Sequence, residues 1–161
     1  RNKLGTVDIL INNAGSLLND SFQSTSYQNV LDMFKVNFFA PAELIKQLIT
    51  FMKGRNSHVV NIGSMASFQG SSKFPGLSYY SASKAAITSL TECLAMELKD
   101  QKISVNCLAI GAVQTEMLAE AFPGFKAPLQ PAEMAEYISE FALNGHQYFN
   151  GKILPVALST P

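Results

Sequence analysis

Residues 7–15 read Val-Asp-Ile-Leu-Ile-Asn-Asn-Ala-Gly, a short, partly β-branched apolar run that stops at a polar turn and a glycine. A run of this kind predicts a buried strand of a parallel sheet. Residues 58–63 and 103–108 repeat the pattern, and residues 152–158 follow an Asn-Gly turn and predict a last strand. The sequence therefore predicts a sheet of short, buried strands.

Three segments between these strands carry apolar side chains at helical spacing, namely residues 28–52, 78–99 and 131–143. Pro41 lies inside the first of them and predicts a kink or a fresh helix start. Strands that alternate with helices indicate an α/β fold with a doubly wound, Rossmann-like parallel sheet covered on both faces. No repeat or linker interrupts residues 1–161, so we expect a single domain.

Composition argues against several classes of protein. Basic and acidic residues balance at 12 each and no basic run occurs, so we expect no nucleic-acid partner. No apolar stretch reaches the roughly 18 residues that cross a membrane. Cys93 and Cys107 have neither metal-ligand nor disulfide spacing, and we expect both to be buried thiols of a reducing, cytoplasmic protein. His58 and His146 have no paired ligand, so we expect no metal.

Tyr80 and Lys84 are four residues apart in the predicted 78–99 helix, so both side chains leave one face about one turn apart. A nearby ammonium favours tyrosinate and is expected to lower the pKa of the phenol, which suits Tyr80 for proton transfer with a carbonyl or an alcohol. The spacing alone is weak evidence, because Tyr148 and Lys152 share it. An Asn-Gly turn separates that second pair, and we interpret it as structural.

The predicted strands end in small or polar residues at 12–15, 63–64 and 110–112. Each is also what an ordinary turn looks like, but the carboxyl ends of parallel strands meet at one edge of a sheet and can line one crevice. A hydroxyl there can hold the reacting oxygen in position. Ser64 is our preferred candidate because it directly follows the strand. Ser67, nearer to Tyr80 in the sequence, is the alternative.

Four motifs occur in order: Asn12-Asn13-Ala14-Gly15, Lys35-Val36-Asn37, Asn61-Ile62-Gly63-Ser64 and Tyr80-Ser81-Ala82-Ser83-Lys84. Together they resemble the short-chain dehydrogenase/reductase family, and their order and approximate spacing match over essentially the whole chain. Four motifs in order are far more specific than any one of them. The part of the family's domain that the chain resembles is its C-terminal two-thirds.

The resemblance implies a role for each motif. Tyr80 would be the catalytic acid/base, Ser64 would orient the substrate carbonyl, and Asn37 would kink its helix and hold a water in a proton relay. Lys84 would bind the nicotinamide ribose and depress the pKa of Tyr80. The cofactor, NAD or NADP with the preference undetermined, would contact Asn12, Ala14, Gly15, Tyr80, Lys84, Ile110, Gly111, Val113 and Thr115.

The chain departs from the family pattern in three places. Ile110-Gly111 stands where Pro-Gly is usual, and Ser64 precedes Tyr80 by a few more residues than usual. The larger departure is the absence of the family's Gly-rich pyrophosphate turn between its first strand and first helix. We therefore expect an N-terminally incomplete domain that lacks the first strand–helix units.

The expected function is NAD(P)-dependent interconversion of an alcohol and a ketone or aldehyde by hydride transfer. The substrate would be a small carbonyl or alcohol compound, covered by a flap over residues 116–129 whose Met, Phe and Leu suit an apolar group. The 78–99 helix is apolar nearly all round, which predicts a homodimer or homotetramer. Two alternatives stay open: a catalytically silent relative that binds nucleotide or partners, and a fragment inactive on its own.

Overall fold

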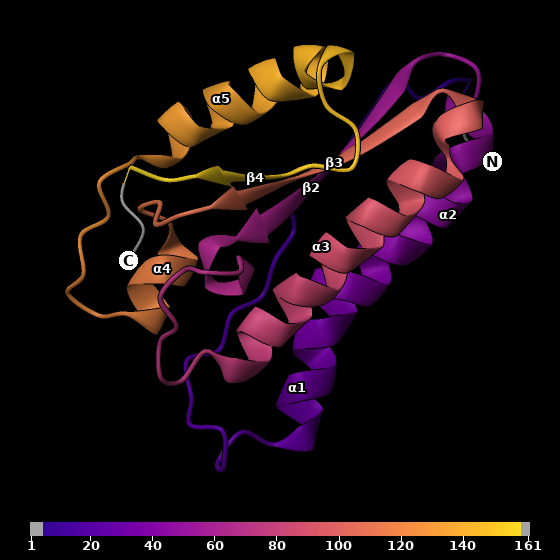
Figure 1. Cartoon of the computed structure of the whole chain (residues 1–161). Coiled ribbons are helices and arrows are strands. Elements are labelled where there is room, and N and C mark those ends of the chain that lie inside the picture. The colour runs from indigo at the N-terminus through magenta and orange to yellow at the C-terminus, as the bar shows by residue number, and fades with distance from the viewer. Residues whose placement is uncertain (1–4, 159–161) are drawn as a thin grey trace.

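The computed structural model describes residues 5–158 (Figure 1). In chain order its elements are β1 (Ile9–Asn12), α1 (Tyr27–Phe34), the π-helical turn η1 (Lys35–Phe39), α2 (Ala40–Met52), β2 (Ser57–Ser64), the 3-10 turn η2 (Met65–Ser67), α3 (Ser78–Glu97), η3 (Lys99–Gln101), β3 (Ile103–Ile110), α4 (Glu116–Ala121), α5 (Pro131–Asn144), η4 (Gly145–Gln147) and β4 (Ile153–Val156). All four predicted strands are present, and their ends shift by a residue or two.

The four strands form one parallel sheet in the order β1-β2-β3-β4. In its register Leu10 lies beside Val59, Val59 beside Val105, and Cys107 beside Ile153. β2 is buried along its whole length and β3 along most of it, as expected for apolar strands at the centre of a parallel sheet. The predicted Rossmann-like α/β fold is confirmed.

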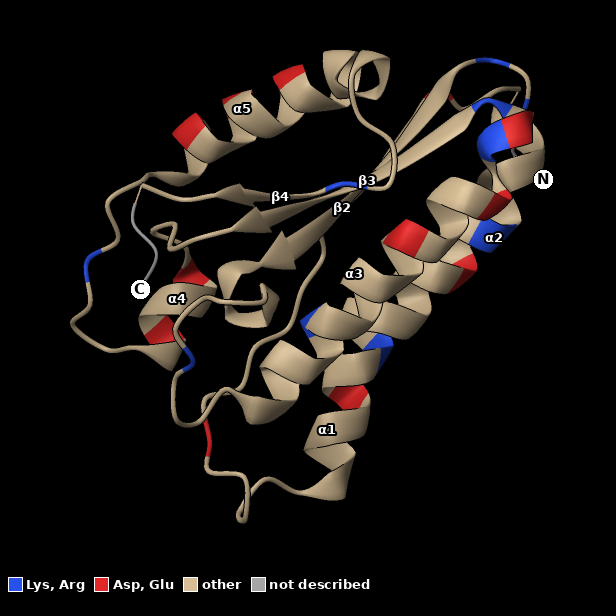
Figure 2. Ribbon diagram, in the orientation of Figure 1, with Lys and Arg blue, Asp and Glu red and all other residues tan. Residues whose placement is uncertain are grey.

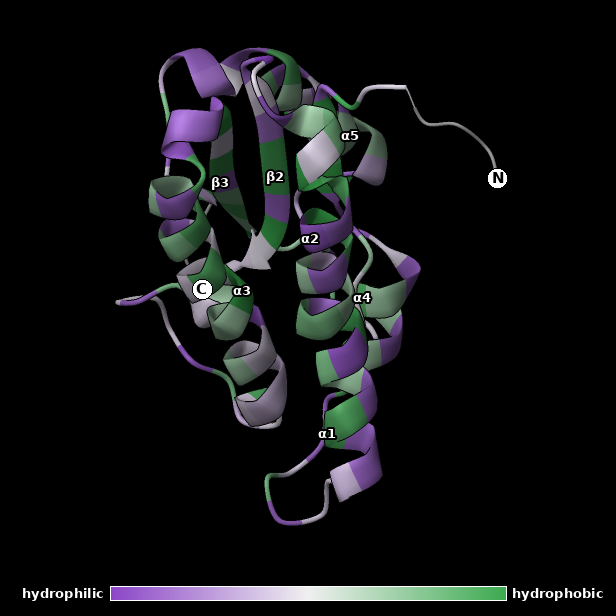
Figure 3. Ribbon diagram, turned by 90° about the vertical axis from the view of Figure 1, so that its right-hand side faces the viewer, coloured by the Kyte–Doolittle hydropathy of each residue, from purple (hydrophilic) through white to green (hydrophobic). Residues whose placement is uncertain are grey.

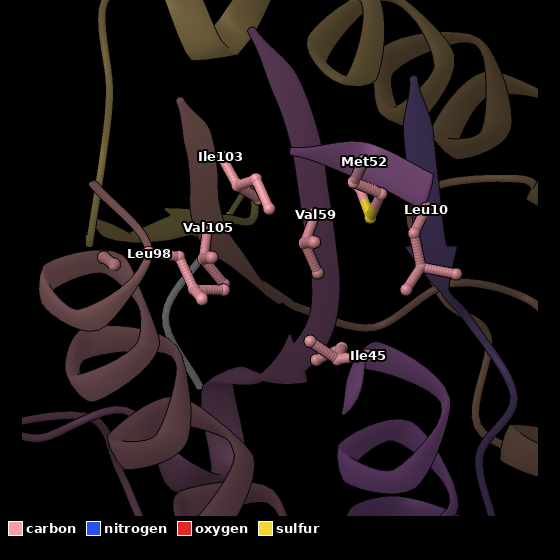
Figure 4. Close-up of a cluster of buried hydrophobic side chains, with 8 residues drawn as sticks. Leu10, Ile45, Met52, Val59, Leu98, Ile103 and Val105 are labelled. Carbon is pink, nitrogen blue, oxygen red and sulfur yellow. The ribbon is translucent and has the colours of Figure 1, made fainter. Parts of the chain in front are cut away.

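Helices cover both faces of the sheet, with α2 and α3 on one face and α5 on the other (Figure 1). The cluster under α2 and α3 contains Leu10, Ile45, Met52, Val59, Ala95, Leu98, Ile103 and Val105 (Figure 4). The cluster under α5 contains Val60, Ile62, Leu108, Phe141 and Ala142. Consecutive residues such as Val59 and Val60 serve opposite faces because side chains alternate along a strand. In Figure 3 β2 accordingly carries green, hydrophobic bands between purple, hydrophilic ones.

The helix predicted over residues 28–52 is interrupted, but the interruption precedes Pro41. It is the π-helical turn η1, in which the Ala40 N–H donates to a carbonyl five residues back. Pro41 is at the start of α2 and has no N–H for the carbonyl of Asn37, four residues earlier, which its ring also crowds. The distortion therefore falls in the turn before the proline, where Asn37 is buried.

The exposure of one of the two cysteines differs from the prediction made from the sequence. Cys107 is buried in β3, but Cys93 is exposed on α3, so the prediction that both thiols are buried is wrong. A helix that is apolar nearly all round does not reveal which face meets the sheet. Residues of both charges occur on α2 and α3, whereas α4 and α5 carry acidic residues alone (Figure 2). Within residues 5–158 no helix has both the length and the apolar character to span a bilayer.

Candidate active site

The first turns of α3 bring Tyr80 and Lys84 against the sheet. Both residues are buried, with 9% and 5% of their surface exposed. The Lys84 Nζ donates to the carbonyl of Ile62 at 2.9 Å, and the side chain of Tyr80 lies beside that of Ser64. The structure therefore brings the helical pair together with the carboxyl end of β2.

Ser64 and Ser67 differ in what their hydroxyls contact. The Ser64 Oγ accepts from the N–H of Ala66 at 3.2 Å and lies at Tyr80. The Ser67 Oγ donates to the carbonyl of Ser64 at 2.8 Å, which closes the turn η2. The geometry therefore favours Ser64 as the hydroxyl that shares a substrate oxygen with Tyr80.

Asn37 fastens the loop after β1 to α3. Its Oδ1 accepts from the Ser16 N–H at 2.8 Å, while its Nδ2 donates to the Ser16 carbonyl at 2.8 Å and to the Ser83 Oγ at 2.9 Å. Gly15 immediately precedes Ser16, which these hydrogen bonds hold. A Cβ on Gly15 would lie 3.5 Å from the Lys84 Nζ and 3.7 Å from the Asn37 Oδ1. A glycine at this position leaves the space in front of Lys84 open.

Burial controls the protonation of the pair. It raises the pKa of Tyr80, with the Ser64 hydrogen bond acting in the opposite direction, and it lowers the pKa of Lys84. The pKa of Tyr80 is raised because desolvation of the phenolate outweighs the stabilisation by Ser64, and Lys84 is not among the causes of the shift, so a lowering by Lys84 stays a prediction. Burial also raises the pKa of the nearby Cys107 thiol to about 12, which leaves it unreactive.

Asn12 has buried partners that sequence reasoning missed. Its Nδ2 donates to the Oδ1 of Asn61 at 2.8 Å, and the Nδ2 of Asn61 donates to the Thr91 Oγ1 at 2.9 Å. These bonds tie β1, β2 and α3 together behind the site. The signal in the sequence is Asn61 itself, since an amide inside an apolar strand needs hydrogen-bond partners. Ser83 was also missed, although it lies one turn after Tyr80 on the same buried face.

The loop after β3 carries the remaining predicted cofactor residues. Ile110 lies beside Ser64 in the β2–β3 register, at the same edge of the sheet. Gly111 packs so closely on the chain after β4 that a Cβ there would lie 2.6 Å from a neighbouring side chain. Val113 forms an isolated bridge to the end of the flap, and the Thr115 Oγ1 accepts a backbone N–H at 3.2 Å as the N-cap of α4.

A cavity of about 280 Å³ adjoins these strand ends. Among its described lining residues, Ser64 and Tyr80 supply the only polar side-chain groups. The other lining residues are Leu17, Met65, Ala66, Phe74, Leu77, Ile110, Gly111, Ala112, Leu118, Phe122 and Phe125. The two predicted catalytic hydroxyls therefore lie in the wall of an otherwise apolar cavity.

The predicted residues fit the nicotinamide end of a dinucleotide. Lys84 uses one of its three N–H donors on Ile62, and Gly15 leaves the adjoining space free. Gly15 is the only glycine between β1 and α1, so the described residues form no Gly-rich cradle for pyrophosphate there. Over residues 5–158 no cluster of His, Cys, Asp and Glu is arranged to hold a metal ion.

A Rossmann-like sheet with a buried Ser-Tyr-Lys constellation at its carboxyl edge defines a class of dehydrogenases. The sequence profile described as short chain dehydrogenase matches residues 1–125. This chain belongs to the short-chain dehydrogenase/reductase family.

Individual relatives are about 30% identical to the chain over the aligned residues. The 3-oxoacyl-[acyl-carrier-protein] reductase FabG of Chlamydia trachomatis is 29% identical over 162 residues, which cover 94% of this chain and 64% of the relative. Dehydrogenase/reductase SDR family member 11 of Mus musculus is 34% identical over 153 residues, which cover 86% of this chain and 58% of the relative.

A solved structure shows the same arrangement of elements. It is 3-ketoacyl-(acyl-carrier-protein) reductase from Brucella melitensis complexed with NADH, with a TM-score of 0.84 at 27% identity. The match covers 94% of this chain and 66% of that structure. The chain thus spans less than two-thirds of the length of these relatives.

Proposed function

We propose that this chain carries the catalytic centre of an NAD(P)-dependent oxidoreductase that interconverts an alcohol and a ketone or aldehyde. The observation that carries the proposal is the buried constellation in which Tyr80 and Ser64 line one cavity, with Lys84 one helical turn after Tyr80 and beside the space left by Gly15. The names of relatives that reduce 3-oxoacyl groups, and a solved relative complexed with NADH, support this class of chemistry.

Tyr80 is the proton donor in the reductive direction. Its raised pKa keeps the hydroxyl protonated at neutral pH, which is the state that can donate to a carbonyl oxygen. The reduced nicotinamide, when bound, supplies hydride to the carbonyl carbon. The Ser64 hydroxyl donates to the same oxygen and holds it in place as negative charge develops. In the oxidative direction the Tyr80 phenolate, which is the form left after reduction, accepts the proton of the alcohol.

Lys84 and Asn37 position the other groups. Lys84 would offer its remaining N–H donors to the cofactor ribose, while Asn37 holds the loop that contains Gly15 against α3. We propose that Asn12 and Ala14 flank the adenosine side of the cofactor, and that Ile110, Gly111, Val113 and Thr115 complete its nicotinamide side. Residues 1–161 would act as one domain, assembled into a homodimer or homotetramer through α3, in the cytoplasm.

Cofactor titration and one substitution test the proposal. Calorimetric titration of NADH and NADPH, into this chain and into a chain extended at its N-terminus, should show binding of at least one cofactor. Binding to the extended chain alone would favour the alternative of a fragment that is inactive on its own. Tyr80→Phe removes only a hydroxyl and should lower the rate of ketone reduction by roughly 10²- to 10⁴-fold, with nearly unchanged cofactor affinity. Tyr148→Phe is the matched control and should be fully active. Binding of neither cofactor, or a Tyr80→Phe variant that keeps most of its activity, would contradict the proposal.

A further inference from the structure

We infer that the substrate is an uncharged ketone or aldehyde, or the matching alcohol, with a compact apolar body, rather than a sugar, a sugar acid or another carboxylate. The inference rests on the proposed function, because it names the occupant of the same site. Its basis is the apolar lining of the cavity of about 280 Å³ beside Ser64 and Tyr80, whose wall at Ile110 and Gly111 is shared with the proposed nicotinamide site.

Apolar side chains from separate segments surround the two hydroxyls. Leu17 comes from the loop after β1, Phe74 and Leu77 come from the loop before α3, and Phe122 follows α4. A polyol that entered this cavity would lose water from several hydroxyls and would find only two side-chain partners. Each buried hydroxyl left unpaired opposes binding, whereas an alkyl or aryl group gains from leaving water.

No charged side chain is among the described residues that line the cavity. The Lys73 Nζ donates to the carbonyls of Ala66 and Phe68 at 3.0 and 2.7 Å. α4 carries Glu116 and Glu120 (red in Figure 2), and neither lines the cavity. A substrate carboxylate would therefore enter without a cation among the described lining residues, and an unpaired buried charge is strongly disfavoured.

The walls of the cavity are connected to one another. The Asn19 Nδ2, in the loop after β1, donates to the carbonyl of Ala121 in α4 at 2.8 Å. The next residue, Asp20, donates its N–H to the carbonyl of Gly76 at 3.1 Å. Gly76 has φ +87°, and a Cβ there would collide with the Asn19 Oδ1. Three wall segments thus meet at Asn19, which gives the apolar cavity a defined shape.

Two matched ketones test the inference without turnover. Acetophenone and 4-acetylbenzoate share an aryl ketone, and the second adds a carboxylate. Titrations of the chain followed by ligand-observed NMR should show acetophenone binding at least about tenfold more tightly, because the carboxylate must leave water unpaired. Equal or tighter binding of 4-acetylbenzoate, or no binding of acetophenone, would overturn the inference.

A charge placed in the wall should reverse this preference. Phe125 lines the cavity and is 51% exposed, so Phe125→Arg should weaken acetophenone and strengthen 4-acetylbenzoate. Tyr148→Arg is the control, since Tyr148 lies outside the cavity at 79% exposed and should leave both affinities unchanged. Misfolding cannot produce a gain in affinity, so the reversal is specific. An unchanged preference in Phe125→Arg would mean that the ketones bind elsewhere, and the inference would fall.

The two proposals fail by different results. Loss of the acetophenone preference overturns the substrate class and leaves the role of Tyr80 intact. Full activity of Tyr80→Phe overturns the proposed function, while the binding preference of the cavity would still be measured directly.

Discussion

Tyr80–Lys84 and Tyr148–Lys152 have the same residue types at the same spacing, but they lie at opposite ends of the sheet. The first pair is buried on α3, beside Ser64 where β2 ends. In the second pair Tyr148 is 79% exposed after η4, and Lys152 immediately precedes β4. Spacing alone does not make an acid–base centre. An acid–base centre also needs both side chains on one helix, buried, and close to the carboxyl end of a strand.

The two ends of the sheet also differ in how their buried polar groups are satisfied. At the amino end, the His58 Nδ1 bonds the carbonyl of Ala142 at 2.9 Å, and its Nε2 lies 3.0 Å from the Nδ2 of Asn106. A hollow of about 390 Å³ adjoins this end, and its lining is mostly polar. The side chains of His58 and Asn106 are hydrogen-bonded to each other, whereas Ser64 and Tyr80 at the carboxyl end face an apolar cavity. Only the second arrangement presents hydroxyls to a substrate.

The largest expected difference between the two pairs comes from their lysines. Lys84→Met keeps the length of the side chain but removes its donors near Tyr80, so ketone reduction should fall by roughly 10²- to 10³-fold. Lys152→Met should leave the rate unchanged, because Lys152 is exposed at the start of β4. Steady-state rates at saturating cofactor measure both. Equal losses in the two variants would remove the distinction between the two ends.

At the amino end the expected effect is on stability. Burial lowers the pKa of His58 from 6.5 to about 4, so between these values the unfolded chain binds the proton and the native chain does not. The stability contributed by neutral His58 is full above pH 6.5 and is lost as the pH falls toward 4, by up to about 3 kcal/mol.

Urea unfolding at pH 7.5 and pH 4.5 measures this loss. His58→Gln should show a smaller decrease in unfolding free energy between the two values than the unmodified chain, because glutamine does not titrate. An equal decrease in both proteins would show that His58 does not titrate on unfolding as proposed.

The choice between Ser64 and Ser67 is a smaller effect at the carboxyl end. Ser64→Ala removes a donor to the reacting oxygen and should lower kcat by roughly 10- to 100-fold, corresponding to about 2 kcal/mol. Ser67→Ala loses only the hydrogen bond to the Ser64 carbonyl and should have a minor effect. The opposite order of losses would assign substrate orientation to Ser67.

The smallest expected effect concerns the wall of the cavity. Asn19→Ala removes the hydrogen bond to α4, worth about 1 kcal/mol, and should raise KM for an apolar ketone several-fold with little change in kcat. Asn144→Ala is the control at the amino end, since its Nδ2 also donates to a backbone carbonyl, that of Glu140, at 3.3 Å. A lower kcat at unchanged KM would mean that Asn19 does not define the cavity.

The sheet and the site centre could be predicted because their signals are local. Apolar runs with β-branched residues mark the strands, and the order of the motifs around Asn37, Ser64 and Tyr80 locates the strand-end crevice. The helical spacing of Tyr80 and Lys84 is enough to place both side chains on one face.

Other features depend on packing between distant segments and could not be predicted. The raised pKa of Tyr80 follows from how completely the fold buries the phenol, which no spacing reports. The exposure of Cys93 depends on which face of α3 meets the sheet. The contact of Asn19 with Gly76 and Ala121 joins two loops and the end of α4, which have no shared periodicity.

The π-helical turn η1 sets the rotational phase between α1 and α2. Each residue of an α-helix turns the chain by about 100°. Deleting one residue between Lys35 and Phe39 would restore regular geometry but would swing α1 by about that angle relative to α2. Met33, which is 2% exposed and packs in the cluster with Tyr80, would then leave the site. The π-helical turn rotates α1 relative to α2, so that the buried face of α1 points to the active site and that of α2 points to the core under the sheet.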